Sequence, residues 1–501
     1  MAVLGLDIGT GGSRAVVVDD GGRVVVSATE PHAPFDSPQT GWAEQDPDDW
    51  WRAAQEAIRA VCADGRVVPA DVRAVGLSGQ MHGAVLLDAA GEVVRPAMIW
   101  CDQRTDAQCR RLTEQIGAAR LIELVSNPAL TGFTLPKLLW VREHEPAAWD
   151  RVRTVLLPKD YVRWRLTGER ATDVADASGT LMFDVAGRRW SSGMLSAVGI
   201  DRSYLPSTHE GPDVTGVVTV QSAEETGLRP GTPVVAGGGD QAAGAVGMGV
   251  VRPGTVSATI GTSGVVFAAT DRPARDPRGR VHTFCHAVPD RWHVMGVTQG
   301  AGLSLRWFRD TFHFGRGTQD LRDPYDRMCE EAATAPVGAD GVLWAPYLMG
   351  ERTPHLDPDA RAALVGLSAS HTRAHVTRAV LEGVAFSLRD TFAIFAEMGV
   401  PTRRIRLGGG GAKSALWRQI QADVYEHEVE VLEAEEGAAF GAALLAGVGV
   451  GQWATVDEAC SVVARVAHTV RPVATNSALL RTRYDRFRQL YSALHPQPPE
   501  D

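Results

Sequence analysis

One carboxylate in this chain stands where it could act in catalysis. Asp240 follows three consecutive glycines at 237–239 and precedes a run of small, helix-forming residues. A β-branched segment over 232–235 leads into the glycines, so the sequence predicts a strand, a turn with accessible backbone and a helix. A carboxylate on such a turn suits a general base that takes a proton from a hydroxyl group. Aspartate is also common as a helix cap, and Asp240 taken alone fits that role better.

Two further glycine-rich turns have a composition suited to phosphate. The first joins apolar strands over 3–8 and 15–19 and contains Asp7 and Thr10. The same pattern returns in the second half of the chain, in a hairpin over 255–269 whose turn is Gly261, Thr262 and Ser263. Main-chain N–H groups and hydroxyls in such turns can hold phosphate oxygens. The repetition predicts an internal duplication, with two similar halves that face each other across a cleft.

A third glycine-rich segment is expected to contact a flat ligand. Four glycines at 408–411 follow a short strand over 404–407 and precede a helical pattern. Backbone without side chains would let an adenine ring and a ribose lie against it. The adjoining Lys413 and Ser414 do not form a Walker A element, because that motif requires spaced glycines and these are contiguous.

Composition limits the classes of function. The chain has 501 residues, enough for two domains, and a net charge of −10, which argues against nucleic acid or an anionic membrane as a partner. No apolar run reaches the roughly 18 residues of a membrane span. Six cysteines lack the spacing of a metal site and fit reduced thiols. The sequence therefore predicts a cytoplasmic protein with small-molecule ligands.

The elements that would position these turns alternate between strands and helices. Asp46 is placed to cap a helix. Strands are predicted over 72–77 and 84–88, with a polar, glycine-bounded turn between them. A long helix is expected to begin at Val380, and a domain boundary is expected near 246–254, where the hairpin pattern restarts. Composition and periodicity alone predict an α/β fold with a duplicated half.

The chain resembles the FGGY family of carbohydrate kinases from its first residues to about residue 450. Several of the motifs are weak singly, but their order and spacing are specific. They are DIGT (7–10), WAEQDP (42–47), GQMHG (79–83), GFTLPKLLW (132–140), LPKDY (157–161), GGGD (237–240), GERTPH (350–355) and GGGGA (408–412). The resemblance implies two ribonuclease H-like (actin/hexokinase-like) domains facing a central cleft. Residues 1–248 would bind the sugar and supply the catalytic base, and 249–501 would bind the nucleotide.

The activity implied by this resemblance is transfer of a phosphoryl group from ATP to the 5-hydroxyl of D-xylulose, with Mg²⁺. The resemblance makes Asp240 the catalytic base, and Asp7 and Asp240 the metal-side carboxylates. The expected sugar-binding residues are Met81, His82, Asp240 and Gln241. The expected nucleotide-binding residues are Thr10, Gly261, Thr262, Ser263, Gly410, Gly411 and Ser414. Sugar and ATP are the expected partners, and a homodimer stays open.

Other functions remain as alternatives. Gln241 follows the base where close relatives are expected to carry asparagine, so another acceptor such as D-ribulose or gluconate stays open. The turn over 79–83 argues against glycerol kinase, whose corresponding turn carries an Arg-Glu pair. In that turn Gln80 and His82 could satisfy the sugar's carbonyl and hydroxyls. A non-kinase, actin-like ATPase is the most distant alternative. Glu351 and Arg352 are expected to form a solvated ion pair without a catalytic role.

Overall fold

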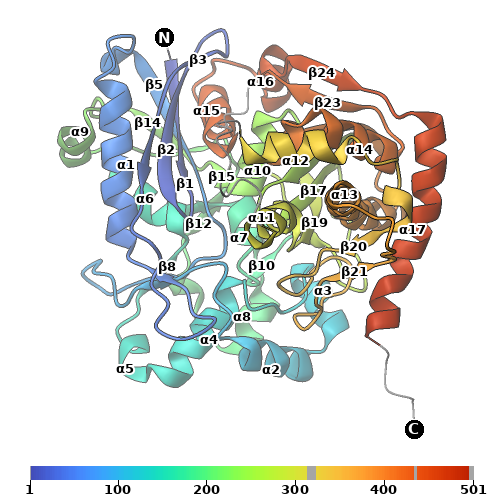
Figure 1. The fold of residues 1–501 in the computed structure, drawn as a ribbon. Helices are drawn as coiled ribbons and strands as arrows, with labels where there is room; N and C mark the ends of the chain where they lie inside the picture. The colour runs from blue at the N-terminus through green and yellow to red at the C-terminus, as the bar shows by residue number, and fades with distance from the viewer. Residues whose placement is uncertain (1, 313–322, 434–436, 496–501) are drawn as a thin grey trace.

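Two seven-stranded sheets form the framework of the protein (Figure 1). The structure, a computed structural model, describes residues 2–312, 323–433 and 437–495. The first sheet has the order β13 (Val214–Val217), β14 (Pro233–Val235), β5 (Val72–Gly79), β1 (Ala2–Ile8), β2 (Gly12–Asp19) and β3 (Val24–Pro31), with β15 (Gly238–Gly239) pairing beside the end of β5. The second has the order β18 (His282–Cys285), β19 (Trp292–Thr298), β17 (Gly264–Thr270), β16 (Gly254–Ile260), β22 (Thr402–Gly409), β23 (Val429–Leu432) and β24 (Val466–Val470).

The two sheets repeat one topology. In the first, β1 pairs antiparallel with β2 and parallel with β5. In the second, β16 pairs antiparallel with β17 and parallel with β22. Both hairpins predicted from the glycine turns are therefore confirmed, and so is the internal duplication. Because the turns end equivalent strands, they occupy equivalent places in the two halves.

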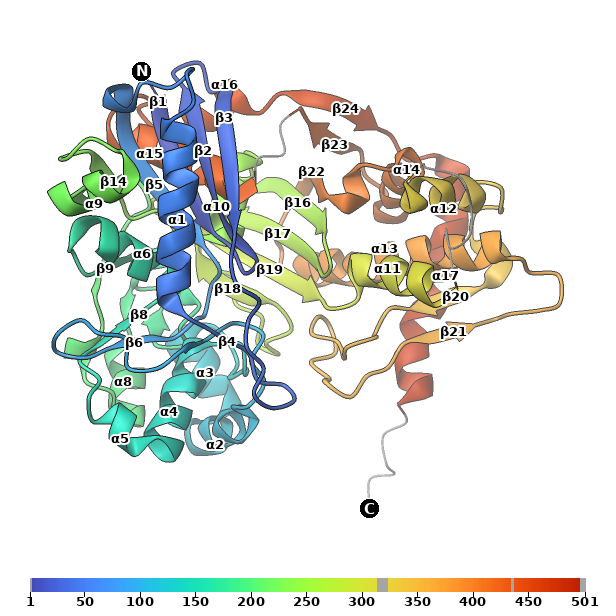
Figure 2. The ribbon, with the colours of Figure 1, turned by 60° about the vertical axis from the view of Figure 1, so that its left-hand side comes forward.

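Helices cover both faces of the first sheet (Figure 2). α1 (Pro47–Cys62) packs on one face; Asp46 caps it by accepting a hydrogen bond from the Asp48 N–H, as predicted. Alternate residues of β1 and β2 point to the opposite face, where α15 (Gly437–Gly449) packs. A Cβ on Gly5 would lie 1.8 Å from the Ala439 oxygen, so this helix touches the strand backbone. The sequence over 437–443 consists mostly of small residues, which permit this close packing; the preceding 435 and 436 lie outside the described residues.

α15 also contacts the helix that begins with the candidate base, α10 (Asp240–Gly247). A Cβ on Gly441 would lie 1.8 Å from the Ala243 oxygen, which leaves room only for glycine at this crossing. By sequence, α15 comes from the second half of the chain, yet it completes the core of the first sheet. The pair of helices therefore joins the two halves through main-chain contact.

The remaining elements form a helical lobe beside the first sheet and the cover of the second. The lobe contains β4 (Glu44–Gln45), β6 (Val85–Leu87), β7 (Ala97–Met98), α2 (Asp106–Ile116), α3 (Ala118–Val125), α4 (Thr134–His144), α5 (Pro146–Trp149), β8 (Thr154–Leu156), β9 (Ala171–Asp173), α7 (Val174–Ser178), β10 (Phe183–Asp184), β11 (Arg189–Trp190), α8 (Ser192–Val198), η2 (Arg202–Tyr204) and β12 (Ser207–His209). Helices α6 (Pro158–Thr167) and α9 (Val220–Thr226) pack with α1 on the first sheet, and η1 (Pro69–Asp71) leads directly into β5. The cover contains α11 (Ala301–Thr311), α12 (Pro324–Ala332), η3 (Ala339–Gly341), β20 (Leu343–Ala345), β21 (Ala363–Val365), α13 (Arg373–Glu397), η4 (Gly410–Ala412), α14 (Ala415–Tyr425) and α17 (Ala474–Leu494). Helix α16 (Val456–Val463) packs on α15, in the core of the first sheet.

Two predicted elements differ from the structure. The long helix α13 begins at Arg373 rather than at Val380, because a capping box of Thr372 and His375 starts it before the buried run. The strand expected over 84–88 is only β6, and its partner is β8. None of the helices in the described part of the chain has the length and apolar character that a membrane span requires.

Candidate active site

A cavity of about 410 Å³ lies between the two sheets. Asp7, on β1, and Asp240, at the start of α10, line it from the first half. From the second half come Thr259 on β16 and the glycines 408 and 409 at the end of β22. The structure therefore brings the candidate base, Asp7 of the first hairpin and the third glycine segment to one cavity. Thr10 and the predicted site residues of the turns over 79–83 and 261–263 are not among the residues that line it.

Asp240 does not cap the helix that it begins. The N-cap of α10 is Gly239, and no side chain makes a capping hydrogen bond. Burial raises the pKa of Asp240 to about 7, and the negative charge of Asp7 adds to the rise. Hydrogen bonds from the main chain and side chain of Gln241 oppose it. Asp240 is thus a carboxyl group whose pKa is close to neutral pH, which suits a general base.

Asp7 is the second carboxylate of the cavity. Burial raises its pKa to about 6, and the nearby Ser78 hydroxyl and the charge of Arg14 oppose this rise. Its Oδ1 atom is buried without a hydrogen-bond partner among the described residues. Two neighbouring carboxylates, one with an unsatisfied oxygen, fit a Mg²⁺ ion that takes few protein ligands and completes its shell with water and phosphate. Among residues 2–312, 323–433 and 437–495, no site has three or more metal-ligating side chains.

His82 lies in the turn after β5 with a left-handed backbone, φ 70°. Its Nδ1 atom is 2.6 Å from the Gly179 oxygen. Because a carbonyl only accepts, Nδ1 carries the proton, and burial holds the pKa of His82 well below its usual value, so the ring is neutral. Nε2 is left as an acceptor for a hydroxyl group. It cannot pair with a carbonyl oxygen of a sugar.

Met81 connects this turn to the candidate base. The residue is 4% exposed, and a Cβ on Gly239 would lie 2.8 Å from the Met81 Cγ atom. The predicted sugar turn and the glycine turn before Asp240 are therefore in direct contact. Only glycine at 239 permits this approach.

The side chain of Gln80, which from its sequence position could have met the sugar, is instead bound within the protein. It is 1% exposed. Its Nε2 donates to Gln45 Oε1 at 2.9 Å, and its Oε1 accepts from Thr10 Oγ1 at 3.3 Å. Thr10 Oγ1 in turn accepts from Trp100 Nε1 at 2.9 Å. These hydrogen bonds fix the predicted phosphate turn at Thr10 relative to the predicted sugar turn over 79–83.

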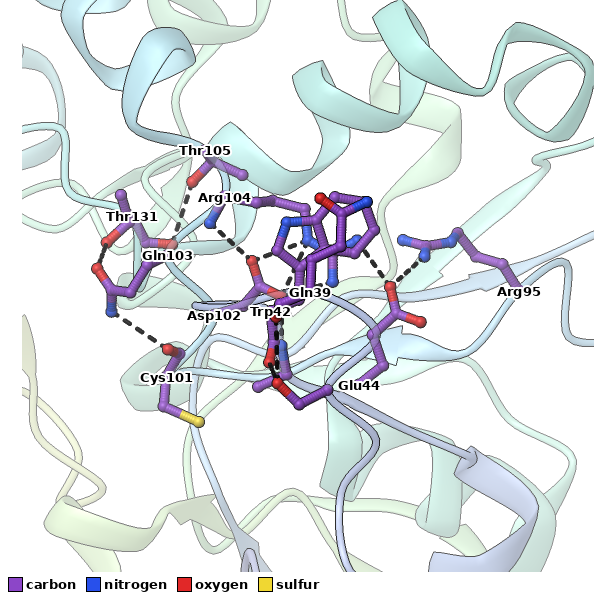
Figure 3. Close-up of polar contacts among 12 residues, drawn as sticks. Gln39, Trp42, Glu44, Arg95, Cys101, Asp102, Gln103, Arg104, Thr105 and Thr131 are labelled. Atoms are coloured by element: carbon purple, nitrogen blue, oxygen red, sulfur yellow. Dashed lines mark hydrogen bonds and ion pairs between the residues drawn. The ribbon is translucent and has the colours of Figure 1, made fainter.

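A charged network holds the loop that follows Trp100 (Figure 3). Arg104 pairs with Asp102 at 2.6 Å and with Glu44 at 2.7 Å. Its guanidinium carbon lies 3.6 Å from the ring centroid of Trp42. Trp42 and Glu44 of the motif over 42–47 are therefore scaffold residues, since their side chains hold this loop.

The predicted nucleotide turns of the second half adjoin each other. Gly409 has φ 71°, and Cβ atoms on Gly409 and Gly411 would lie 2.5 Å and 2.7 Å from atoms of Ile260. Ile260 directly precedes the turn made of Gly261, Thr262 and Ser263. Gly410 and Gly411 form the 3-10 turn η4. Ser414 Oγ accepts a hydrogen bond from the Trp417 N–H and so caps α14.

Glu351 and Arg352 do not form the solvated ion pair predicted from the sequence. Glu351 is 3% exposed, and its Oε1 accepts hydrogen bonds from the N–H groups of Gln299 and Arg352. Burial raises the pKa of Glu351 to about 8. The carboxyl group is therefore a buried link between segments and not part of a solvated ion pair. The guanidinium of Arg352 reaches Gly132, where a Cβ would lie 3.2 Å from Nη2.

Lys137 was missed altogether. Its ammonium group is fully buried and donates to main-chain oxygens around His82. The only signal in the sequence is a lysine inside an apolar helical stretch, and such a lysine usually extends its charged end into water.

The architecture and the shared cavity define an α/β enzyme with two ribonuclease H-like halves, as in actin and hexokinase. Residues 2–247 match the N-terminal domain of the FGGY family of carbohydrate kinases, and residues 256–450 match its C-terminal domain. The chain belongs to this family, and the predicted fold class is confirmed. Membership identifies a carbohydrate kinase, which uses ATP, and rules out the non-kinase ATPase.

Relatives match the whole length of the chain. It is 38% identical over 490 residues to a xylulose kinase of Bacillus subtilis, covering 98% of this chain and 96% of the relative. It is 39% identical over 494 residues to a xylulose kinase of Escherichia coli, covering 98% and 99%. The crystal structure of xylulose kinase from Rhodospirillum rubrum aligns with a TM-score of 0.91 at 31% identity and covers 99% of both chains.

Proposed function

We propose that this protein transfers the terminal phosphoryl group of ATP to the 5-hydroxyl of D-xylulose, giving D-xylulose 5-phosphate and ADP. One observation carries the chemistry: Asp240 lines a cavity that both halves share, together with Gly408 and Gly409, and the preceding Gly239 contacts Met81 of the predicted sugar turn. The substrate is proposed from the relatives, which are xylulose kinases at 38% and 39% identity over nearly the full chain.

In the proposed reaction Asp240 is the base. The 5-oxygen of the sugar bonds to the γ-phosphorus, the bond from that phosphorus to the β,γ-bridging oxygen breaks, and the hydroxyl proton passes to the Asp240 carboxylate. Phosphoryl transfer needs little covalent assistance, so alignment and charge neutralisation are the protein's main contributions. The raised pKa of Asp240 supports this role because it makes the carboxylate a better proton acceptor.

We propose Asp7 and Asp240 as the Mg²⁺-side residues. The unsatisfied Oδ1 of Asp7 supports the assignment. Bound Mg²⁺ would neutralise charge on the phosphate oxygens during transfer. Asp7 would orient the ion and its waters, and Asp240 would remain on the sugar side of it.

The division of labour between the halves is also a proposal. Residues 1–248 would hold the sugar through Met81, His82 and Gln241, and residues 249–501 would hold the nucleotide. The residues assigned to the nucleotide and its phosphates are Thr10, which comes from the first half, and Gly261, Thr262, Ser263, Gly410, Gly411 and Ser414 from the second half. The contact of the turns at 261–263 and 409–411 through Ile260 supports a single nucleotide site. Six free cysteine thiols support a cytoplasmic location.

A coupled assay of ADP release over D-xylulose, D-ribulose, gluconate and glycerol tests the substrate. D-Xylulose should have the highest kcat/KM. A site built to hydrogen-bond particular hydroxyls discriminates against analogues that misplace them, because its own buried groups then lose their partners. If D-ribulose or gluconate is preferred, the kinase assignment stands and the substrate changes; Gln241, which hydrogen-bonds to the base, is the residue to exchange for asparagine in that case.

A further inference from the structure

Lys137 lies in the first turn of α4 and has an unusual environment for a lysine. Its side chain is 0% exposed. The ammonium nitrogen donates to three main-chain oxygens: His82 O at 3.1 Å, Phe133 O at 3.3 Å and Gly132 O at short range. No ion pair of Lys137 with a carboxylate occurs in the described part of the chain. The three ammonium hydrogens thus match three carbonyl acceptors.

This arrangement does not favour the stability of the folded protein. Burial of an ammonium group is unfavourable, and here it lowers the pKa of Lys137 to about 7. An apolar side chain of similar length would fill the same space without that cost, as replacements of buried ionic groups often show. A buried lysine that binds only backbone oxygens therefore points to a requirement for the position of that backbone.

The backbone that Lys137 binds is that of His82 and its neighbours. A left-handed φ of 70° is unfavourable for histidine, so surrounding contacts must maintain it. The His82 oxygen receives a second hydrogen bond, from Thr134 Oγ1 at 3.1 Å. Phe133, whose oxygen Lys137 also binds, packs edge-on against the His82 ring with centroids 5.0 Å apart. Lys137 therefore constrains both the main chain of His82 and the residue that packs on its ring.

We propose that Lys137 is a positioning residue for the sugar site: it holds the His82 turn so that Nδ1 donates to Gly179 and Nε2 faces the sugar as an acceptor. The inference rests on the proposed sugar kinase function. Lys137 would act only through His82, and it would not touch the sugar. Thr134 shares this task through the same oxygen.

A double-mutant cycle between Lys137 and His82 tests this proposal. Lys137→Met should lower kcat/KM for D-xylulose about tenfold or more, mainly by raising the sugar KM, with the KM for ATP unchanged. In the His82→Ala background the same change should have almost no further effect. Additive losses, or an equal rise in the KM for ATP, would overturn the proposal. Thr134→Val is a second variant in which a smaller loss is expected, since it removes one donor to the His82 oxygen and leaves the lysine in place.

A second readout does not depend on which sugar is the substrate. In ¹⁵N-histidine NMR spectra, the His82 signal, assigned from its loss in His82→Ala, should show the Nδ1–H tautomer in wild type. Lys137→Met or Thr134→Val should shift it towards a mixture of tautomers while the other histidine signals stay in place. An unchanged His82 signal in folded variants would contradict the positioning role. Failure of D-xylulose as a substrate, with the tautomer result intact, would contradict only the proposed function.

Discussion

Asp240 is the residue whose loss should affect turnover most. Asp240→Asn removes the proton acceptor and should lower kcat by about 10²–10⁴-fold. Because the side chain makes no capping bond, the melting temperature should change little. Turnover in the coupled assay and thermal unfolding of the same preparation separate the two effects. A folded variant that keeps more than about a tenth of wild-type turnover would exclude Asp240 as the base.

Asp7 should affect the metal-dependent step more than sugar binding. Asp7→Ala removes one of two carboxylates proposed to orient Mg²⁺, so turnover should fall and should demand a higher Mg²⁺ concentration. Sugar affinity without nucleotide should stay near that of wild type. Tryptophan fluorescence can measure this affinity, because Trp100 is linked through Thr10 to Gln80 in the predicted sugar turn. A large loss of sugar affinity would place Asp7 on the sugar side instead.

His82 should determine which hydroxyl pattern is accepted. The ring of His82 is neutral and its Nε2 is an acceptor, so a substrate with a hydroxyl group that donates to Nε2 should bind more tightly. His82→Ala should reduce kcat/KM for D-xylulose strongly and for a poor substrate only slightly, which narrows the ratio between the two. Steady-state kinetics on both sugars measures the ratio. An unchanged ratio would mean that His82 does not contact the sugar.

Lys137 should make sugar binding depend on pH. Its pKa is lowered from 10.5 to about 7, so the ammonium form prevails below pH 7 and the neutral amine above it. The amine has two hydrogens for three carbonyls, and sugar affinity should therefore weaken as the pH is raised through 7. The groups that act on the ammonium are Asp102, Cys101, Cys109 and Arg352. Fluorescence titration of the sugar at several pH values checks this, and Lys137→Met should flatten the profile.

Single residues also show where sequence reasoning stops. The two glycine-turn hairpins and the position of Asp240 between a glycine turn and a helix were predictable, because each depends on a local pattern of glycines, hydroxyls and carboxylates. Gln80 and Lys137 were not, because their partners lie far away in sequence: Gln45 for the first and the His82 oxygen for the second. Nothing local distinguishes a glutamine that links two turns from one that binds a sugar.

At the scale of elements, the crossing of α15 with β1 depends on glycine. A Cβ on Gly5 would lie 1.8 Å from the Ala439 oxygen, a distance that backbone atoms cannot relieve without moving the helix. Gly5→Val should lower the free energy of unfolding by several kcal/mol, above the roughly 1–3 kcal/mol of ordinary overpacking. Gly65→Ala is the matched control, since a Cβ there meets nothing within 4 Å. Urea denaturation of both variants measures the difference, and equal stabilities would contradict the close contact.

The boundaries of helices were predictable where capping residues mark the end of the helix in the sequence. α1 begins after Asp46 and Pro47, as expected. α13 begins earlier than its apolar run because its first turn is polar and is fixed by Thr372 and His375. The pairing of β6 with β8 depends on the packing of the helical lobe, which no local pattern encodes.

At the scale of the whole molecule, the duplication was predictable from the repeated hairpin, but the exchange of α15 was not. A fragment of residues 1–248 would expose the face of the first sheet that α15 covers, including Val3 and Val16. We expect this fragment to aggregate or to stay partly unfolded when expressed alone. Adding residues 437–463 as a separate chain should improve its solubility. A cooperative, monomeric fragment 1–248 would show that α15 is dispensable for the first half.

The late position of α15 has a consequence for synthesis. Strands β1 and β2 leave the ribosome first, yet the helix that covers one of their faces consists of residues 437–449. For most of translation, the apolar residues on that face have no partner and are open to association with other nascent chains. The core of the first half therefore stays incomplete until α15 has been synthesised. We expect production in a foreign host to be limited by chaperone supply more than by codon choice near the start of the gene.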